Sequence, residues 1–313
     1  MHALGVDVGG TKIAAGVVDG SGKILARQEC PTPGTPEQID AAIAGLYRLL
    51  AGSHPVDRVG IAAAGLISSD RTTAMFAPNL PWRSYPLGTR VGSQIGPAVS
   101  LVVENDANAA GWAEYRFGAG RGRDMLMLTI GTGVGGAIIA GGRLLRGAFG
   151  AAAEVGHLQI VADGFLCGCG QRGCLEAYAS GPALERMATE ALTAQPERAA
   201  RLRTLADPGG AVRGRHVAAA AAEGDELSLD LLDRLGRWAG RGAASLVAVL
   251  DPAVIVVGGG VASVGELLLA GIRRGLADHL TARDRRPTAE VVAAKLGNDA
   301  GLVGAADLAR PTD

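Results

Sequence analysis

The segment Asp7-Val-Gly-Gly-Thr-Lys12 combines residue types that suit binding of a phosphate. Gly9 and Gly10 allow backbone N–H groups to converge on an anion, while Thr11 and Lys12 add a hydroxyl donor and a cation. Asp7 ends an apolar run and could hold Mg²⁺ or its waters beside the phosphates. The segment is not a P-loop, because no G-x-x-x-x-G-K-[ST] precedes a helix. A simple hairpin corner is the alternative interpretation.

Two further glycine clusters also follow apolar runs. Gly131-Thr132-Gly133-Val134-Gly135-Gly136 follows residues 125–130. Its glycine spacing differs from the dinucleotide-binding fingerprint, and a strand follows where that fingerprint needs a helix. We therefore expect a second phosphate-binding turn. Gly258-Gly259-Gly260 follows residues 254–257 and allows a base or ribose to approach the backbone, although a helix N-terminal turn would also explain it.

The segment Glu104-Asn105-Asp106-Ala107-Asn108 lies at the end of an expected strand, before an expected helix. An Asp at this place is commonly a helix N-cap. A kinase, however, needs a carboxylate that accepts the proton of the attacking hydroxyl and orients its oxygen. Because two candidate phosphate turns occur in the same chain, Asp106 is also a candidate catalytic base.

The most specific pattern comprises one histidine and three cysteines within 18 residues: His157, Cys167, Cys169 and Cys174. One imidazole and three thiolates match a tetrahedral zinc site with no open position, which is typical of structural zinc. Glu154 and Glu176 flank these ligands and are not needed for the tetrahedron. They can hydrogen-bond a polyhydroxylated substrate, or they are simply surface or supporting carboxylates.

The elements that position these residues follow from the hydrophobic pattern. We expect strands over 3–8, 13–18, 58–63, 98–103, 125–130, 136–140 and 254–257, and helices over 37–50, 108–117, 227–249 and 301–310. The unit of strand, glycine turn and strand occurs twice, about 120 residues apart. The repeat predicts two similar α/β halves, although a glycine-rich α/β protein also produces such pairs by chance.

Composition excludes several classes of protein. The chain has 313 residues, of which 48% are hydrophobic, and a net charge of −1, which indicates folded domains. No block of five or more like charges is present, so we expect no nucleic-acid partner. We also expect no membrane span, because the most apolar stretch, 245–264, is interrupted by Asp251, Pro252 and glycines. Without a recognisable secretory signal, a cytoplasmic location is expected.

Together, these motifs resemble the ROK family (repressors, open reading frames, kinases) over essentially the whole chain. The resemblance rests on four segments, namely Asp7–Lys12, Glu104–Ala110, Gly131–Gly136 and the run from Glu154 through His157 and the three cysteines to Glu176. It is strongest toward the ATP-dependent glucokinases of high-GC bacteria, including Phe76-Ala-Pro-Asn79-Leu-Pro-Trp82 and the ending Gly301–Arg310.

The resemblance implies an actin-like ATPase fold, also called ribonuclease H-like, with two α/β domains around a cleft that holds ATP and sugar. The domains implied are a small one over 1–113 plus 302–313 and a large one over 114–301 with the zinc loop. Asp106 would be the base acting on the sugar 6-hydroxyl. Sugar hydroxyls would be contacted by Gly65, Asn79, Asn105, Asp106, Glu154, His157 and Glu176. Asp7, Gly9–Lys12 and Gly131–Gly133 would serve the phosphates and Mg²⁺, and Gly258–Gly260 the adenosine.

Two departures from the family pattern lie near the implied sugar site. The family often has proline before the glycine that matches Gly65, where this chain has Ala64. It also often has glycine before the acidic residue that matches Glu154, where this chain has Ala153. Both are small residues, so the departures bear on loop geometry more than on chemistry.

The resemblance leaves alternatives open. The expected reaction transfers the ATP γ-phosphate to glucose O6, but the acceptor could be an N-acetylhexosamine, mannose or fructose, and the donor polyphosphate. A sugar-responsive repressor of the same family is disfavoured, because such repressors carry an N-terminal helix-turn-helix and here a strand is expected from residue 3. The family also implies a homodimer or homotetramer.

Overall fold

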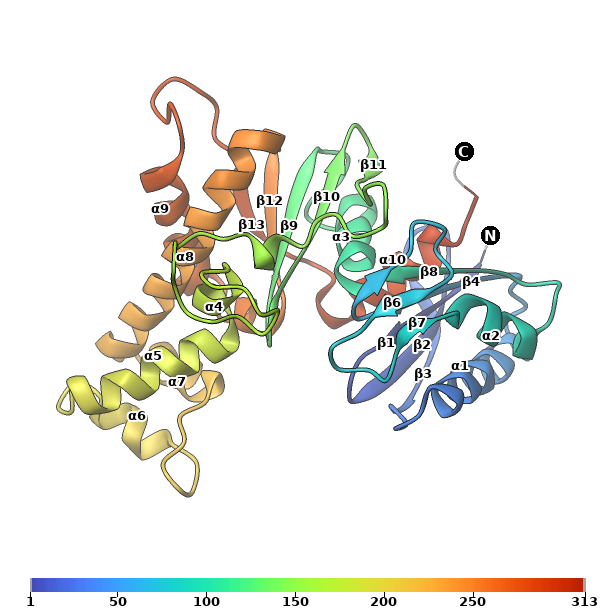
Figure 1. The fold of residues 1–313 in the computed structure, drawn as a ribbon, viewed down its shortest axis with the longest axis horizontal. Helices are drawn as coiled ribbons and strands as arrows, with labels where there is room; N and C mark the ends of the chain where they lie inside the picture. The colour runs from blue at the N-terminus through green and yellow to red at the C-terminus, as the bar shows by residue number, and fades with distance from the viewer. Residues whose placement is uncertain (1, 312–313) are drawn as a thin grey trace. The chain divides into compact units, whose positions relative to one another are not determined.

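The computed structural model describes residues 2–311; residues 1, 312 and 313, which the expected domain ranges include, lie outside the described part. The chain divides into two compact units (Figure 1). Unit 1 comprises residues 1–126, 137–153 and 294–313, and unit 2 comprises residues 127–136 and 154–293. The functional domain boundary expected after residue 113 stays a prediction.

Unit 1 contains a five-stranded sheet, a small three-stranded sheet and four α-helices among its described residues. The large sheet has the order β3-β2-β1-β4-β8, and the small one has the order β5-β6-β7. The strands are β1 (Ala3–Val8), β2 (Lys12–Val18), β3 (Ile24–Pro31), β4 (Arg58–Ala63), β5 (Leu66–Ile67), β6 (Ala74–Phe76), β7 (Arg83–Tyr85) and β8 (Ser100–Asn105). The helices are α1 (Pro36–Ala51), α2 (Leu87–Ile95), α3 (Asp106–Phe117) and α10 (Ala300–Leu308), the last preceded by the 3₁₀ turn η3 (Gly297–Asp299).

The two faces of the large sheet of unit 1 pack against different helices. Because neighbouring residues of a strand point to opposite faces, Leu4, Val6 and Val8 of β1 pack in one core cluster with α1 and α2. Ala3 and the other residues of the second face pack against α3 and α10. A Cβ at Gly5 would lie 1.9 Å from the Leu302 carbonyl oxygen, so only glycine lets α10 approach so closely. The expected C-terminal helix is thus part of the unit 1 core.

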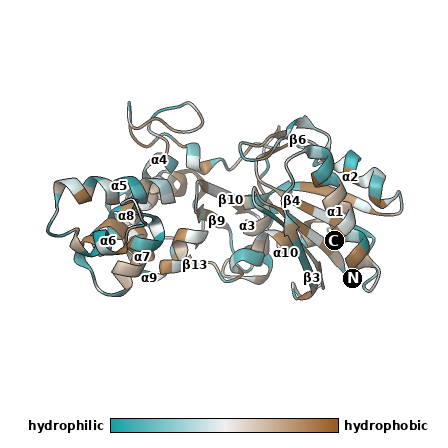
Figure 2. Cartoon of the chain, turned by 90° about the horizontal axis from the view of Figure 1, so that it is seen from below, coloured by the Kyte–Doolittle hydropathy of each residue, from teal (hydrophilic) through white to brown (hydrophobic). Residues whose placement is uncertain are grey.

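Unit 2 is mostly helical. Its helices are α4 (Glu176–Ala179), α5 (Gly181–Ala194), α6 (Ala200–Leu205), α7 (Gly214–Ala222), α8 (Glu226–Leu250) and α9 (Glu266–His279), with 3₁₀ turns η1 (Val155–His157) and η2 (Gly260–Val264). Two strands, β12 (Val254–Gly258) and β13 (Glu290–Ala293), lie wholly within it. Figure 2 colours α5 in both teal and brown, in keeping with a helix whose buried residues share one face.

The second five-stranded sheet confirms the internal repeat. Its order is β11-β10-β9-β12-β13, with β9 (Met125–Ile130), β10 (Val134–Ala140) and β11 (Arg143–Leu144). In each sheet, three strands consecutive in the chain lie in reverse order, and two later strands follow. The last two strands are parallel in both cases, β4 with β8 and β12 with β13. The repeated motif of strand, glycine turn and strand therefore begins two sheets of the same order.

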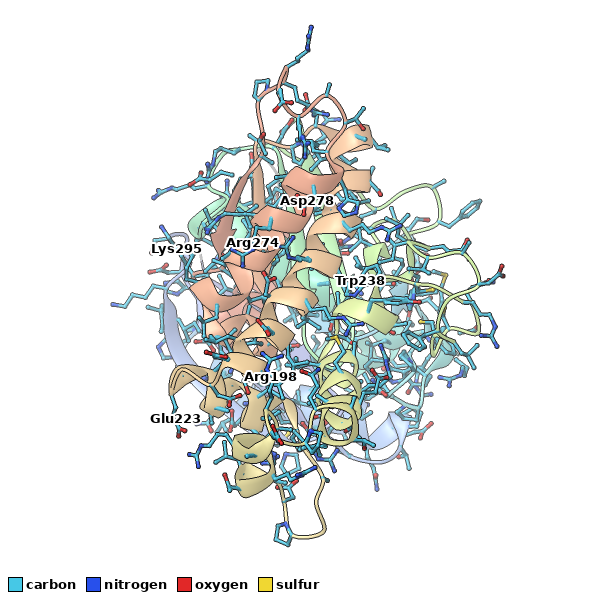
Figure 3. All side chains as sticks on the ribbon, turned by 90° about the vertical axis from the view of Figure 1, so that its left-hand side faces the viewer. Arg198, Glu223, Trp238, Arg274, Asp278 and Lys295 are labelled. Carbon is cyan, nitrogen blue, oxygen red and sulfur yellow. The ribbon has the colours of Figure 1, made fainter. Side chains whose placement is uncertain are left out.

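Helices α8 and α9 pack closely through glycine. A Cβ at Gly240 would lie 2.2 Å from the Ile272 carbonyl oxygen, so a larger residue would force the helices apart. Ion pairs flank this contact: Arg274 Nε lies 2.9 Å from Asp233 Oδ1, and Arg237 donates to Asp278 at 2.8 Å. Arg274 and Asp278 lie on the same helix, α9 (Figure 3).

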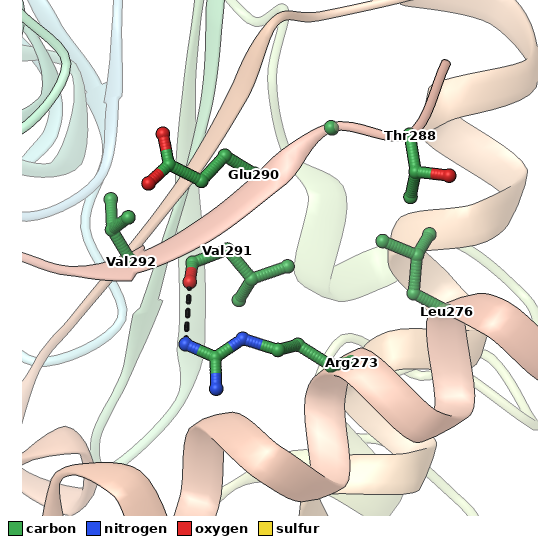
Figure 4. Close-up of a pocket in the computed structure, with 7 residues that line it drawn as sticks. Arg273, Leu276, Thr288, Glu290, Val291 and Val292 are labelled. Carbon is green, nitrogen blue, oxygen red and sulfur yellow. Dashed lines mark hydrogen bonds between the residues drawn. The ribbon is translucent and has the colours of Figure 1, made fainter.

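Strand β13 is at the edge of its sheet, where open backbone groups invite pairing with other chains. Arg273 of α9 donates to the Val291 carbonyl oxygen at 2.8 Å, so a side chain satisfies one edge group (Figure 4). None of the helices within residues 2–311 has the length and apolar character needed to cross a membrane.

Candidate functional site

The parallel strands of unit 1 bring three of the predicted segments to one edge of the sheet. Asp7 of β1 pairs with Ala62 of β4, and Ala62 pairs in turn with Glu104 of β8. The carboxyl ends of parallel strands meet at the same edge, where α/β proteins commonly bind ligands. The segment after β1, Gly65 and the Asn105–Asp106 pair are therefore neighbours in space although they are far apart in the chain.

Asp106 is the first residue of α3, and the cap of that helix is supplied by Asn105 instead. Asn105 Oδ1 accepts from the Asn108 backbone N–H at 2.9 Å. The helix therefore begins two residues earlier than its apolar pattern predicted. Because Asn105 caps the helix, Asp106 is not the N-cap. Its carboxylate is therefore available for another role.

The amide of Asn105 holds both Asp106 and Gly65. Its Nδ2 donates to Asp106 Oδ1 at 3.1 Å and to the Gly65 carbonyl oxygen at 3.0 Å. Gly65 has φ +131°, and a Cβ there would lie 2.3 Å from the Phe76 carbonyl oxygen, so glycine is required. Burial raises the pKa of Asp106, whereas backbone N–H groups of Ala107 and Asp106 and the Asn105 amide lower it, and the net direction is upward. A raised pKa makes this carboxylate a better proton acceptor.

Asp7 lies close enough to Asp106 for their charges to interact. Burial, followed by the charge of Asp106, raises the pKa of Asp7 to about 6, against the lowering effect of Lys12 and Arg27. Two carboxylates in one partly buried place cannot ionise easily together unless a cation joins them. This electrostatic arrangement is therefore suited to Mg²⁺, whose preferred ligands are carboxylate oxygens and water.

The turn between β1 and β2 is fixed from outside the predicted motif. Gly9 N–H donates to the Lys12 carbonyl oxygen at 3.0 Å, and Thr32 Oγ1 donates to the Gly9 carbonyl oxygen at 2.6 Å. A Cβ at Gly10 would lie 3.6 Å from the Asn79 Cβ, so the candidate phosphate turn and Asn79 are adjacent. Thr32 was not predicted, because a lone threonine after a strand gives no signal.

The loop that carries the exposed Asn79 is held by Arg83, a residue that the sequence pattern did not predict to be functional. Arg83 donates to the carbonyl oxygens of Ala77 at 2.7 Å and Trp82 at 2.6 Å. Its guanidinium also lies 4.4 Å from the centre of the Phe76 ring. Arg83 thus fixes the conformation of the segment on which Asn79 is presented.

In unit 2, the two predicted glycine turns lie next to each other. The turn Gly131–Gly133 is closed by a bond from Gly131 N–H to the Gly133 carbonyl oxygen at 2.9 Å. A Cβ at Gly131 would lie 3.9 Å from the backbone nitrogen of Gly260, and Gly259 has φ +89° with the Ile130 backbone against it. Strand β10 begins at Val134, so only the first three residues of the six-residue motif form the turn.

The predicted zinc ligands are gathered in unit 2. The ligand atoms of His157, Cys167, Cys169 and Cys174 all lie within 4.8 Å of one another. Cys169 Sγ lies 3.7 Å from Cys174 Sγ, and Cys167 Sγ lies 3.7 Å from His157 Nδ1. Zinc–sulfur bonds of about 2.3 Å in a tetrahedron give sulfur–sulfur distances of about 3.8 Å, so the four residues fit a zinc ion.

Burial and hydrogen bonds shift the pKa values of the three cysteines in different directions. Burial raises the pKa of Cys167 to about 12 and also raises the pKa of Cys174, whereas a hydrogen bond from the Gln171 backbone N–H lowers the pKa of Cys169. A bound cation favours the thiolate form of a cysteine. The approach of Nδ1 to Cys167 leaves the Nε2 nitrogen of His157 as the ring atom available to other partners.

Glu176 connects the cysteine cluster to the glycine turn. Its Oε2 accepts from the Val134 backbone N–H at 3.0 Å, and its Oε1 lies 3.6 Å from Cys167 Sγ. A Cβ at Gly133 would lie 2.4 Å from Glu176 Oε2, so the turn needs glycine to make room for this carboxylate. Glu154 precedes the turn η1 and its carbonyl oxygen accepts from His157 N–H at 3.1 Å.

Ala153, one of the departures noted above, has φ +68°. This left-handed conformation costs a residue with a Cβ about 1–2 kcal/mol and costs glycine almost nothing. The departure therefore places mild backbone strain directly before Glu154.

Comparison with known proteins adds independent information. The model of the ROK family matches residues 3–312. A glucokinase of Streptomyces coelicolor is 50% identical over 313 residues, which cover 99% of this chain and 98% of the relative. An N-acetylmannosamine kinase of Escherichia coli is 37% identical and covers 99% of each chain. The crystal structure of a ROK family glucokinase from Streptomyces griseus with glucose and AMPPNP superposes with a TM-score of 0.88 at 50% identity, covering 99% of each chain.

Proposed function

The chain belongs to the ROK family, and from this premise we propose that it is an ATP-dependent glucokinase that transfers the γ-phosphate of ATP to the 6-hydroxyl of D-glucose. Its fold is the actin-like ATPase fold, with mixed α/β sheets and helices. The activity rests on full-length identity of 50% to glucokinases and on similarity to a structure that holds glucose and an ATP analogue.

The observation within the molecule that carries the proposal is the position of Asp106. It lies at the carboxyl edge of β8, is held by Asn105, and is not used to cap α3. We assign it as the general base. The 6-hydroxyl oxygen forms a bond to the γ-phosphorus, the bond from that phosphorus to the β–γ bridging oxygen breaks, and the hydroxyl proton passes to the Asp106 carboxylate.

Six further residues are proposed to contact the sugar. Asn79 and Asn105 present amides, and Gly65 presents backbone groups. Glu154 and Glu176 present carboxylates, and His157 presents an imidazole. Carboxylates and amides accept and donate hydrogen bonds to sugar hydroxyls, and their correct placement orients the 6-hydroxyl for attack.

The phosphates of ATP are proposed to bind at two turns, Gly9–Lys12 and Gly131–Gly133, and the adenosine at Gly258–Gly260. Thr132 adds a hydroxyl within the second turn. Backbone N–H groups in such turns are fixed donors for an anion. Asp7 would hold Mg²⁺, directly or through water, and the cation would neutralise phosphate charge during transfer.

We propose that His157 Nδ1 and the three cysteines hold a structural Zn²⁺. The ion would fix the ring orientation and tautomer of His157, so that Nε2 meets the sugar. Both the nearby Glu176 and the adjoining η1 turn depend on the same loop for their position.

Steady-state kinetics with ATP and Mg²⁺ test the proposed activity. The panel contains glucose, mannose, fructose, N-acetylglucosamine and N-acetylmannosamine. We expect the highest kcat/KM with glucose. A higher kcat/KM for N-acetylmannosamine would favour an N-acetylmannosamine kinase, as the 37% identical Escherichia coli relative is named. A higher kcat/KM with polyphosphate than with ATP would overturn the assignment of the donor.

Two further properties are proposed on the family resemblance. The protein forms a homodimer or homotetramer, which sedimentation velocity distinguishes from a monomer. It acts in the cytoplasm, where ATP is available and where thiols of the cysteine cluster remain reduced.

A further inference from the structure

Unit 1 contains a cavity that the proposed catalytic and binding residues do not line. Its volume is about 970 Å³. It lies among the helix α3, the hairpin of β10 and β11, and the C-terminal end of α10 with the residues that follow. Five arginines line it, namely Arg71, Arg116, Arg143, Arg146 and Arg310. Positive charges that lie close together repel one another, so five arginines around one cavity are unfavourable without negative charges to balance them.

Two of the arginines share one buried carboxylate. Arg146 Nε lies 2.7 Å from Glu104 Oε2, and Arg71 Nε lies 3.5 Å from the same oxygen. Glu104 itself is almost completely buried. One negative charge therefore serves two guanidinium groups, which leaves one positive charge uncompensated.

A second carboxylate, that of Asp307, is shared by two arginines in the same way. Arg116 Nε lies 3.0 Å and Arg310 Nη1 2.6 Å from the carboxylate oxygens of Asp307. Asp307 also accepts from the Trp112 indole N–H at 2.8 Å, so its acceptor capacity is heavily used. Again two guanidinium groups face one carboxylate.

The fifth arginine, Arg143, has no carboxylate partner within residues 2–311. Four guanidinium groups thus share two carboxylates and the fifth has none, so three positive charges remain around the cavity. Two of the arginines also keep unused donors: Arg71 Nε and Arg310 Nε are buried and make no hydrogen bond in the described structure, the 3.5 Å approach of Arg71 to Glu104 lacking the required geometry. A buried donor without a partner costs about 1–3 kcal/mol.

The chemistry of the lining selects a class of ligand. Guanidinium groups bind phosphate oxygens through paired hydrogen bonds, and they do so better than other side chains. The rings of Trp112 and Tyr115, with centres 5.4 Å apart, add an aromatic wall to the same cavity. We propose that this cavity binds a small anion bearing phosphate, with two or more negative charges, at a site separate from that of ATP and glucose.

Isothermal titration calorimetry tests this proposal on the full chain. The protein is first saturated with glucose and AMPPNP, so that the proposed catalytic residues are occupied. Inorganic phosphate, tripolyphosphate and glucose 6-phosphate are then titrated separately. At least one should bind, and Arg143→Glu should raise its Kd at least tenfold, as expected for the loss of a charge-assisted hydrogen bond and its reversal to repulsion.

A matched charge reversal provides the control. Arg285 is an exposed arginine of the segment between α9 and β13, so Arg285→Glu should leave the Kd within twofold of wild type. Tighter binding of tripolyphosphate identifies a free oligophosphate as the ligand, and tighter binding of glucose 6-phosphate identifies an ester. If Arg143→Glu does not fold by circular dichroism, Arg143→Gln replaces it with the same expectation.

Two results would overturn the proposal. One is that none of the three probes, at about 10 mM, binds to wild-type protein saturated with glucose and AMPPNP, because a weaker Kd would not indicate a specific site. The other is binding whose Kd is unchanged in Arg143→Glu. Kinase activity of Arg143→Glu without added probe should equal that of wild type, which separates this test from the test of the catalytic proposal.

Discussion

The Asn105 side chain donates through Nδ2 to Asp106 Oδ1 at 3.1 Å, while its own Oδ1 caps helix α3. One amide therefore ties the start of the helix to the orientation of the proposed base. The carboxylate is held in place before any substrate arrives, which reduces the reorganisation needed in the transition state.

Replacing the base should abolish turnover without unfolding the protein. In Asp106→Asn the proton acceptor is lost, and such losses typically reduce rate by about 10²–10⁴. We expect kcat to fall by that factor while the thermal midpoint stays the same or rises slightly, because burial disfavours the charged form. Retention of more than about a tenth of wild-type kcat would contradict this assignment.

The ionised Asp7 carboxylate should lower the free energy of unfolding at neutral pH. Its pKa of about 6 in the folded protein exceeds the ordinary value of 3.8, so its contribution to stability is present at acid pH and is lost as pH rises through 6. Asp7→Asn should therefore stabilise the protein at pH 7.5 by up to about 3 kcal/mol, less the part that solvent screens. The gain should disappear below about pH 4.

Urea unfolding at both pH values, without added magnesium, measures this effect. Asp70→Asn is the matched control, because hydrogen bonds from Ser68 and Thr72 lower the pKa of Asp70. The stabilisation by ionised Asp70 is present above its ordinary pKa and is lost in acid. Asp70→Asn should therefore lower the free energy of unfolding at pH 7.5. The same sign for both variants would show that the Asp7 interpretation is wrong. Asp7→Asn should also raise the KM for ATP–Mg²⁺.

Loss of a zinc ligand should act on the sugar more than on the nucleotide. Cys169→Ser should lower zinc content and raise the KM for glucose steeply, because the loop also carries His157 and Glu176. ATP affinity should change far less. Cys30→Ser, outside the cluster, should change none of the three quantities. A zinc-free protein with wild-type glucose KM would mean that the metal only stabilises a surface loop.

The two carboxylates beside the zinc ligands should behave differently. Glu176 accepts from the Val134 backbone, at the end of the proposed phosphate turn. Glu176→Ala should therefore raise the KM for both glucose and ATP, each roughly tenfold, as expected for loss of a hydrogen bond to a charged acceptor. Glu154→Ala should raise the KM for glucose alone. Equal effects of the two variants on the KM for ATP would argue against the coupling through Val134.

The sequence predicted those parts of the molecule that have local signals. The strands around Asp7 and the glycine turns were found because apolar runs end in small or polar residues, and the four clustered zinc ligands were found by spacing. Helix α3 was placed two residues late, because its pattern of apolar residues does not show which polar residue caps it.

What the sequence could not predict depends on contacts between distant residues. The pairing of Glu104 with Arg146 joins residues 42 positions apart, and nothing in the motif that begins at Glu104 indicates its distant partner. Strands β5, β6 and β7 have only two or three residues each, too few for alternation to show. The same is true of the five arginines around the cavity, which come from four separate stretches of the chain.

The docking of α10 against β1 has a consequence for how the chain is made. Gly5 and Gly60 leave room for Leu302 and Ala305, so the first strand made completes its packing only with one of the last helices made. At synthesis rates of about 5–20 residues per second, roughly 15–60 seconds separate the two. During that interval on the ribosome, one face of the growing amino-terminal sheet lacks the part of its cover that α10 provides, and chaperones that recognise exposed apolar strands would have their longest opportunity there.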